Sequence, residues 1–205
     1  MRPTRRLTLA AFAALALGAG SGGAWAAATL RADDMVMGSP KARVTVVEYA
    51  SVTCSHCGHW HQTVYPAFKA KYVDTGKVRY VFRELPTAPA NAAYGGFLLA
   101  RCAGKEGYFK VIADLMNDQA YLFSTRDGRG WLVRAGAKSG IAEDRVLACA
   151  GDQEAAAVMD ARIEATTTAD KVNSTPTFFV NGKRLESGEL AHLSAAIDPL
   201  LAGKR

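Results

Sequence analysis

Residues 44–50 read Val44-Thr45-Val46-Val47-Glu48-Tyr49-Ala50, and the motif Cys54-Ser55-His56-Cys57 follows after three intervening residues. The first stretch is rich in β-branched residues and predicts a buried strand. Beyond the motif, apolar residues recur every four positions and predict a helix, which Pro66 should kink or break; they are Trp60, Val64, Phe68 and Tyr72. A strand that leads through two cysteines into a helix indicates an α/β domain with the cysteine pair at the helix N-terminus.

The rest of the chain predicts one α/β unit interrupted by helices. A second strand is expected over Val78–Arg83. Residues 88–168 are rich in alanine and carry several short amphipathic segments, so they predict an all-helical insertion. Strands resume at Thr177–Val180 and Lys183–Leu185, joined by the hairpin dipeptide Asn181-Gly182. A last helix is expected from about 188 to 201, so the α/β unit comprises 27–87 and 169–205.

The N-terminus has the pattern of a cleaved secretory signal peptide over residues 1–26. Three arginines precede an uncharged apolar run from Leu7 to Ala19, and Ala24-Trp25-Ala26 fits a cleavage site. A membrane anchor is the alternative, but spanning takes about 20 apolar residues. Export to the periplasm is therefore expected, by the general or the twin-arginine route. Removing these arginines lowers the formal charge from +6 to +3, which gives no argument for nucleic-acid binding.

The position of the cysteine pair predicts redox chemistry. Unpaired N–H groups and the dipole at a helix N-terminus favour an anion, and such settings lower a thiol pKa to about 3.5–7.5. Cys54 is then the exposed nucleophile and Cys57 the more buried resolving thiol. His56, between them, is expected to tune the pair. Metal binding is the alternative, but the candidate histidine ligands crowd the same helix start; they are His56, His59 and His61.

Two motifs carry a family resemblance. The first is Val47-Glu48-Tyr49 before Cys54-Ser55-His56-Cys57, with Thr75-Gly76-Lys77-Val78-Arg79-Tyr80 after it. The second, about 120 residues later, is Asn173-Ser174-Thr175-Pro176-Thr177-Phe178-Phe179-Val180-Asn181-Gly182. Together they resemble the DsbA family of thiol–disulfide oxidoreductases. The resemblance implies a thioredoxin-like fold with an inserted all-helical subdomain.

The resemblance also implies roles for single residues. Pro176 aligns with a cis-proline that faces the cysteine pair, and the backbone of Thr175 would then pair with an extended substrate segment. Glu48 matches a buried acidic residue that relays protons to Cys57, the alternative being a solvent-facing strand end. Some relatives carry a second bridge in the helical subdomain, so Cys102 and Cys149 are expected to form a structural disulfide. Two buried thiols are the alternative.

The implied function is to introduce disulfide bonds into reduced, unfolded exported proteins. No cofactor is expected beyond the Cys54–Cys57 disulfide and no metal, and a membrane partner of DsbB type would reoxidise the pair. The chain is expected to be a monomer. Ser55 and Thr175 depart from the proline and valine that strongly oxidising members often have, so the oxidising strength stays open. The alternatives are a disulfide reductase or isomerase on the same fold, and a periplasmic metal-binding or copper-delivery module.

Overall fold

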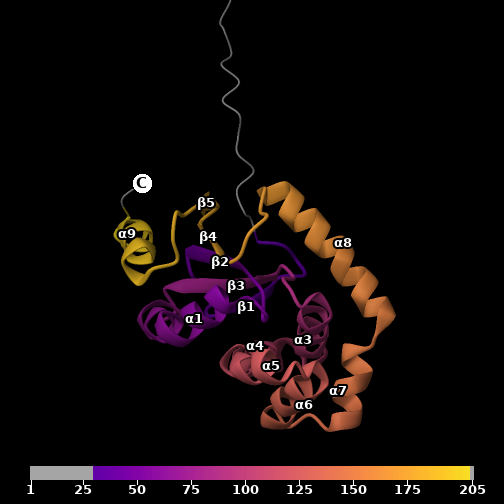
Figure 1. Ribbon diagram of the computed structural model, residues 1–205. Coiled ribbons are helices and arrows are strands. Elements are labelled where there is room, and N and C mark those ends of the chain that lie inside the picture. The colour runs from indigo at the N-terminus through magenta and orange to yellow at the C-terminus, as the bar shows by residue number, and fades with distance from the viewer. Residues whose placement is uncertain (1–29, 204–205) are drawn as a thin grey trace, which may run out of the picture.

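The computed structural model describes residues 30–203, so the expected signal peptide lies outside the described residues. A five-stranded sheet has the order β1-β3-β2-β4-β5 (Figure 1). β2 is parallel to β3, whereas the pairs β1–β3, β2–β4 and β4–β5 are antiparallel. The strands are β1 Met35–Met37, β2 Val44–Ala50, β3 Val78–Glu84, β4 Thr177–Val180 and β5 Lys183–Arg184.

The central strand β2 positions the site. All seven of its residues are buried, because β3 and β4 flank it and both faces of the sheet are covered. Side chains alternate along a strand. Val46 and Ala50 therefore join the main core on one face, while Val47 and Tyr49 join a small second core on the other. The strand ends four residues before Cys54, so the short turn that follows places the cysteine at the edge of the main core.

The helices divide into two groups. Those of the α/β unit are α1 Ser55–Thr63, α2 Tyr65–Phe68, the short π-helix η1 Lys69–Val73 and α9 Leu190–Leu201. Those of the insertion are α3 Ala90–Cys102, α4 Gly104–Asn117, α5 Gln119–Thr125, α6 Gly128–Lys138, α7 Glu143–Ala150 and α8 Gln153–Asp170. Helices α3–α7 gather on one side of the sheet, and α8 runs back toward β4 (Figure 1).

The thioredoxin-like fold with a helical insertion, predicted from the sequence, is confirmed. The predicted break at Pro66 is also present, since α1 ends at Thr63 and α2 places Pro66 in its first turn. The sequence pattern missed β1, because three residues are too few to show a strand period. Among the described residues, no helix combines the length and apolar character needed to cross a membrane.

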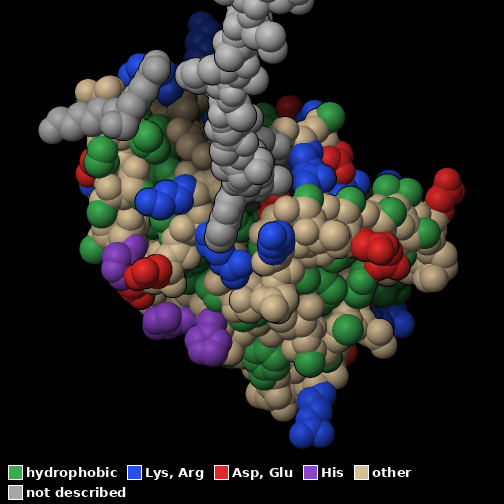
Figure 2. Space-filling view, turned by 90° about the horizontal axis from the view of Figure 1, so that it is seen from above, with side chains coloured by type: hydrophobic (Ala, Val, Ile, Leu, Met, Phe, Trp, Pro, Cys, Tyr) green, Lys and Arg blue, Asp and Glu red, His purple; other side chains and the backbone are tan. Residues whose placement is uncertain are grey.

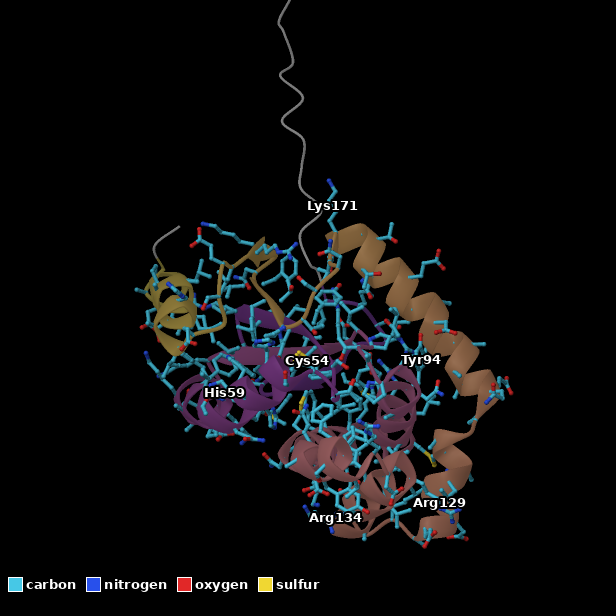
Figure 3. All side chains as sticks on the ribbon, in the orientation of Figure 1. Cys54, His59, Tyr94, Arg129, Arg134 and Lys171 are labelled. Carbon is cyan, nitrogen blue, oxygen red and sulfur yellow. A yellow bond between two sulfur atoms is a disulfide. The ribbon has the colours of Figure 1, made fainter. Side chains whose placement is uncertain are left out.

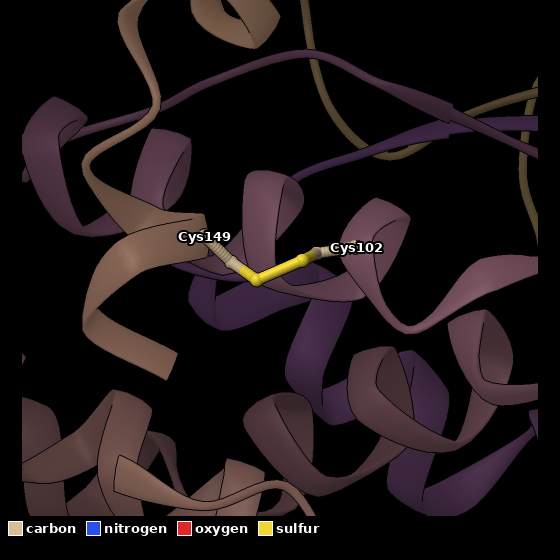
Figure 4. Close-up of a disulfide and its surroundings, with 2 residues drawn as sticks. All are labelled: Cys102 and Cys149. Carbon is tan, nitrogen blue, oxygen red and sulfur yellow. A yellow bond between two sulfur atoms is a disulfide. The ribbon is translucent and has the colours of Figure 1, made fainter. Parts of the chain in front are cut away.

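A disulfide joins Cys102, the last residue of α3, to Cys149 in α7 (Figure 4). The two residues are 47 positions apart, and their Cα atoms lie 5.9 Å from each other. The bond therefore closes a large loop inside the insertion, which includes α4, α5 and α6. Such a link lowers the conformational entropy of the unfolded chain and so stabilises the folded one.

Replacing both cysteines of this bridge by alanine is expected to lower the free energy of unfolding by about 2–4 kcal/mol, the usual value for a loop of this size. Urea unfolding of the oxidised proteins measures the difference. The reduced wild type and the reduced variant serve as the control pair, and their difference should be much smaller. A loss below about 1 kcal/mol in the oxidised pair would show that the bridge does not restrict the unfolded insertion.

Candidate active site

Cys54 is the N-cap residue of α1, directly after the turn that follows β2. Its Sγ accepts a hydrogen bond from the backbone N–H of Cys57 at 3.3 Å. Figure 3 shows Cys54 in the middle of the molecule, between the sheet and the insertion. The sulfur thus takes the place that the side-chain oxygen of serine or aspartate takes at ordinary helix starts. A thiolate in this position also faces the positive end of the helix dipole.

The two thiols of the pair have opposite acidities. Hydrogen bonding from the Cys57 side chain, helped by the Thr175 side chain and the backbone N–H groups of Cys57 and His56, lowers the pKa of Cys54 to about 5, although burial opposes this. Burial raises the pKa of Cys57 far above its ordinary value, and the nearby Cys54 and Glu48 add to that increase. At neutral pH the geometry therefore gives one thiolate and one thiol.

The expectation that Cys54 is exposed is wrong in degree. Its exposed fraction is only 8%, against 0% for Cys57. The order of the two matches the assigned roles, because only Cys54 offers surface to a partner. The neighbouring segments that cover the rest of Cys54 restrict the directions from which a second sulfur can approach.

Thr175, which precedes Pro176, lies beside Cys54, although the two residues are 121 positions apart in the sequence. The carbonyl oxygen of Thr175 lies 3.7 Å from Sγ of Cys54, and Cys54 donates to it when the thiol is protonated. The Thr175–Pro176 peptide bond is cis, and Thr177 begins β4, the antiparallel neighbour of β2. The structure therefore places a backbone segment beside the reactive sulfur, at the end of a strand.

Glu48 lies inside the protein, with an exposed fraction of 1%, so the alternative of a solvent-facing strand end is wrong. Its carboxyl group accepts a hydrogen bond from the hydroxyl of Tyr80 on β3. Burial raises the pKa of Glu48 to about 8, the Tyr80 hydrogen bond lowers it, and the Cys54 charge raises it further. Glu48 thus holds a proton near neutral pH, and its charge influences the pKa of Cys57. Its role as a proton relay to Cys57 stays a prediction.

The histidines near the motif are spread over different environments. His56 and His59 are exposed on α1, and histidine side chains lie at one margin of the face shown in Figure 2. His61 is buried and stacks on the ring of Tyr65, with 4.5 Å between centroids, and burial lowers its pKa to about 4. Within residues 30–203 no three His, Cys, Asp or Glu side chains come together to hold a metal ion. A tuning role for the His56 side chain stays a prediction.

Two residues at the site escaped the sequence reasoning. Tyr80 binds Glu48, and Gln119 of α5 donates from Nε2 to the carbonyl oxygens of Val52 at 2.8 Å and Cys54 at 3.0 Å. Strand alternation could have found Tyr80. On the parallel strands β2 and β3, Val46 pairs with Tyr80 and Glu48 with Phe82, so Tyr80 and Glu48 point to the same face of the sheet. No local signal marks Gln119, which lies 65 residues from Cys54 in the sequence.

The raised pKa of Glu48 predicts how stability depends on pH. Between about pH 4.5 and pH 8 the folded protein holds a proton that the unfolded chain has released. In the oxidised protein Cys54 carries no charge, but the burial that chiefly raises this pKa persists. The free energy of unfolding of the oxidised protein should therefore fall as pH rises above about 4.5, by at most about 1.4 kcal/mol per pH unit, over an interval that ends below pH 8. Urea unfolding at several pH values measures the slope, and Glu48→Gln should remove it.

The reduced protein supplies the internal control. Because the pKa of Cys54 is lowered from 9.0 to about 5, the reduced folded state has lost a proton that the unfolded chain keeps over that interval. This contribution makes stability rise with pH from about 5 to 9, and it disappears as pH falls through 5. The two slopes should largely cancel between pH 5 and 8. Equal slopes for oxidised wild type and Glu48→Gln would contradict the assignment.

Comparison with known proteins places this site in a family. The sequence model of the thioredoxin family matches residues 31–199. A protein of Rickettsia bellii, named as a candidate protein-disulfide oxidoreductase, is 35% identical over 167 residues, which cover 81% of this chain and 64% of that protein. A similarly named protein of Rickettsia typhi is 35% identical over 173 residues, 82% of this chain and 62% of the relative. The chain thus spans less than two thirds of these relatives.

Solved structures with a similar fold include proteins of the same kind as the sequence relatives. The crystal structure of alpha-DsbA1 from Wolbachia pipientis superposes with a TM-score of 0.77 at 27% identity, covering 85% of this chain and 94% of that one. A protein-disulfide isomerase from Novosphingobium aromaticivorans superposes with a TM-score of 0.67 at 20% identity, covering 82% and 97%, and shares the fold. The family match covers most of residues 30–203, including the cysteine pair and the insertion. The chain therefore belongs to the thioredoxin family and, within it, is a DsbA-like protein.

Proposed function

We propose that this protein is an exported thiol–disulfide oxidoreductase that introduces disulfide bonds into reduced, unfolded proteins through Cys54 and Cys57. The observation that carries the proposal is the difference between the two thiols: the pKa of Cys54 is lowered to about 5, while burial raises that of Cys57. Stabilising the Cys54 thiolate stabilises the reduced enzyme, so the oxidised pair becomes a stronger oxidant.

The reaction begins with the oxidised pair. A substrate thiolate attacks Sγ of Cys54, the bond between Cys54 and Cys57 breaks, and Cys57 leaves with the electron pair. Because Cys57 binds a proton strongly, it needs one at this moment, and the protonated carboxyl group of Glu48 supplies it. The product of this step is a mixed disulfide between substrate and Cys54.

The second step releases the substrate. Another substrate thiol, after losing its proton, attacks the substrate sulfur of the mixed disulfide, and Cys54 leaves as a thiolate. A group with a pKa of about 5 is a good leaving group at neutral pH. The substrate has lost two electrons and the enzyme has gained them as a thiolate and a thiol. During both steps an extended substrate segment would pair with the backbone of Thr175, which lies 3.7 Å from Cys54 Sγ.

The chemistry of this reaction indicates which cofactor, compartment and partner the enzyme would need. The Cys54–Cys57 disulfide is the only redox group that the reaction needs, so the proposal includes no further cofactor and no metal. An oxidising compartment, which we infer to be the periplasm, keeps such a pair oxidised. A membrane protein of DsbB type would reoxidise the pair after each cycle, and the enzyme would work as a monomer.

The reduction potential tests the proposal. Equilibration of the purified protein with glutathione buffers should give a potential well above the about −270 mV of thioredoxin. The oxidised protein should also form disulfides in a reduced, unfolded substrate, with one substrate disulfide made per enzyme reduced. A potential near that of thioredoxin would assign the protein to disulfide reduction. Rapid rearrangement of wrongly paired substrate, with little net oxidation, would indicate an isomerase.

A further inference from the structure

The first residue of α5 reaches into the loop that carries the nucleophile. Gln119 is buried, with an exposed fraction of 6%, and its Nε2 donates to the carbonyl oxygens of Val52 and Cys54 at 2.8 and 3.0 Å. Both carbonyls belong to the turn between β2 and α1. One side chain of the helical insertion thus binds the active-site loop at two carbonyls, on either side of Thr53.

The residue after the motif is shaped for this contact. A Cβ atom at Gly58 would lie 2.1 Å from Oε1 of Gln119, so any larger residue would push the amide away. The backbone N–H of Gly58 also donates to the Cys54 carbonyl at 3.0 Å. The carbonyl of the nucleophile therefore accepts two hydrogen bonds, one from its own helix and one from the insertion. The absence of a side chain at Gly58 leaves the space for the Gln119 amide.

The backbone conformation of this loop determines where the Cys54 sulfur lies relative to the start of α1. Sγ of Cys54 accepts from the N–H of Cys57 at 3.3 Å, and this alignment requires a fixed backbone at Cys54. A hydrogen bond between the hydroxyls of Thr53 and Thr87, 3.0 Å apart, also holds the middle of the loop. It does not involve the Val52 or Cys54 carbonyls. Without Gln119 the Val52 carbonyl, which belongs to a residue with 0% exposure, would lose its donor in the protein interior.

We propose that Gln119 is a positioning residue through which the helical insertion aligns Cys54 with the start of α1, and that it thereby sets the oxidising strength of the pair. The inference rests on the proposed redox function of Cys54 and Cys57. It assigns the insertion a part in the chemistry, in addition to packing against the sheet. Gly58 and Gln119 act together, since the missing side chain of one gives space to the amide of the other.

Gln119→Leu tests the proposal because it keeps the bulk and removes the donor. The pKa of Cys54, followed by thiolate absorbance, should rise by about one unit, and the equilibrium constant with glutathione should shift about tenfold toward a weaker oxidant. This is the effect expected if misalignment weakens the hydrogen bond that the charged sulfur accepts from the Cys57 N–H. Gln62→Leu is the matched control. Gln62 donates from α1 to the carbonyl of Met116 in α4 at 3.2 Å and does not contact the Cys54 loop. It should lower stability without changing the pKa or the equilibrium constant.

Gly58→Ala tests the same contact between Gly58 and Gln119 by changing the glycine. It keeps the Gln119 amide but displaces it, so the pKa of Cys54 should rise in this variant as well. In the double variant Gly58→Ala/Gln119→Leu, the alanine should add little, because the amide it displaces is already gone. Additive shifts would overturn the inference, and so would an unchanged pKa in Gly58→Ala. The second variant also decides the matter if Gln119→Leu does not fold.

The outcome for wild type separates this inference from the proposed function. If Cys54 of the wild type titrates near the ordinary thiol value, the proposed oxidase itself fails, whatever the variants do. If the wild type has a low pKa and Gln119→Leu loses stability only, as Gln62→Leu does, the oxidase stands and the positioning role of Gln119 falls.

Discussion

Cys54→Ser is expected to abolish disulfide exchange, while Cys57→Ser is expected to form a mixed disulfide at Cys54 and to stop there. Serine is a far poorer nucleophile than a thiolate with a pKa of about 5, so loss of Cys54 should cost several orders of magnitude in rate. In Cys57→Ser the reactive sulfur remains and still caps α1. It can attack a substrate disulfide, but no second thiol is present to resolve the product.

The measurement is mass spectrometry after mixing each variant with a disulfide-containing peptide. Cys57→Ser should accumulate a covalent adduct at Cys54, and Cys54→Ser should remain unmodified. The variant with Cys102 and Cys149 both replaced by alanine is the control, and it should retain exchange because the bridge lies within the insertion. Exchange that persists in Cys54→Ser would place the nucleophile elsewhere and contradict the site.

The sequence revealed the parts of the fold that have strong local signals. The run of β-branched residues in β2, the four-residue spacing after the cysteines and the Asn181-Gly182 turn each report a backbone conformation directly. β1 gave no such signal, because Met35–Met37 is an edge strand of three residues whose pairing with β3 comes from tertiary structure. Local sequence therefore predicted the central strands and the helix of the α/β unit better than the edge strand of its sheet.

The candidate site shows the same limit. Cys54 and Cys57 follow from the motif and its position, and the family resemblance pointed to Glu48, Thr175 and Pro176. The partners that set their chemistry were not recognised from the sequence: Tyr80, although it ends the first motif, lies 32 residues from Glu48, and Gln119 lies 65 from Cys54. A pKa depends on burial and on such distant groups, so the acidity of Glu48 required the packed structure.

The largest expected change in stability comes from Arg83, on the face of the sheet opposite to Glu48. Its guanidinium binds both oxygens of Asp34, at 2.9 and 2.8 Å, and Oδ2 of Asp170 at 2.6 Å. The side chains are 2–3% exposed. The hydroxyl of Tyr49 also contacts Arg83, at 3.0 Å, and donates to Asp170. These bonds join β3 to the segment before β1 and to the end of α8.

Arg83→Met should lower the free energy of unfolding by about 3–5 kcal/mol, because it leaves two buried carboxylates without their cation. Urea unfolding measures the loss. Arg134→Met is the control: Arg134 also binds a carboxylate through two nitrogens, on Asp118 at 2.7 and 3.1 Å, but its side chain is 48% exposed. Removing such a surface pair should lower the free energy of unfolding far less, because solvent screens an exposed ion pair. Equal losses in the two variants would show that burial does not determine the strength of the Arg83 cluster.

The same variant tests whether the cluster supports the site. Asp170 ends α8, and only five residues separate it from Pro176, so the bond to Arg83 anchors the start of the segment that places Thr175 beside Cys54. Replacing both carboxylates as well, in Asp34→Asn/Arg83→Met/Asp170→Asn, should restore part of the lost stability, because no buried charge remains. It should not restore the anchor fully, since an amide and a thioether cannot reproduce the ionic bonds. Exchange rates measured below the unfolding transition should therefore stay reduced in the triple variant even where its stability recovers.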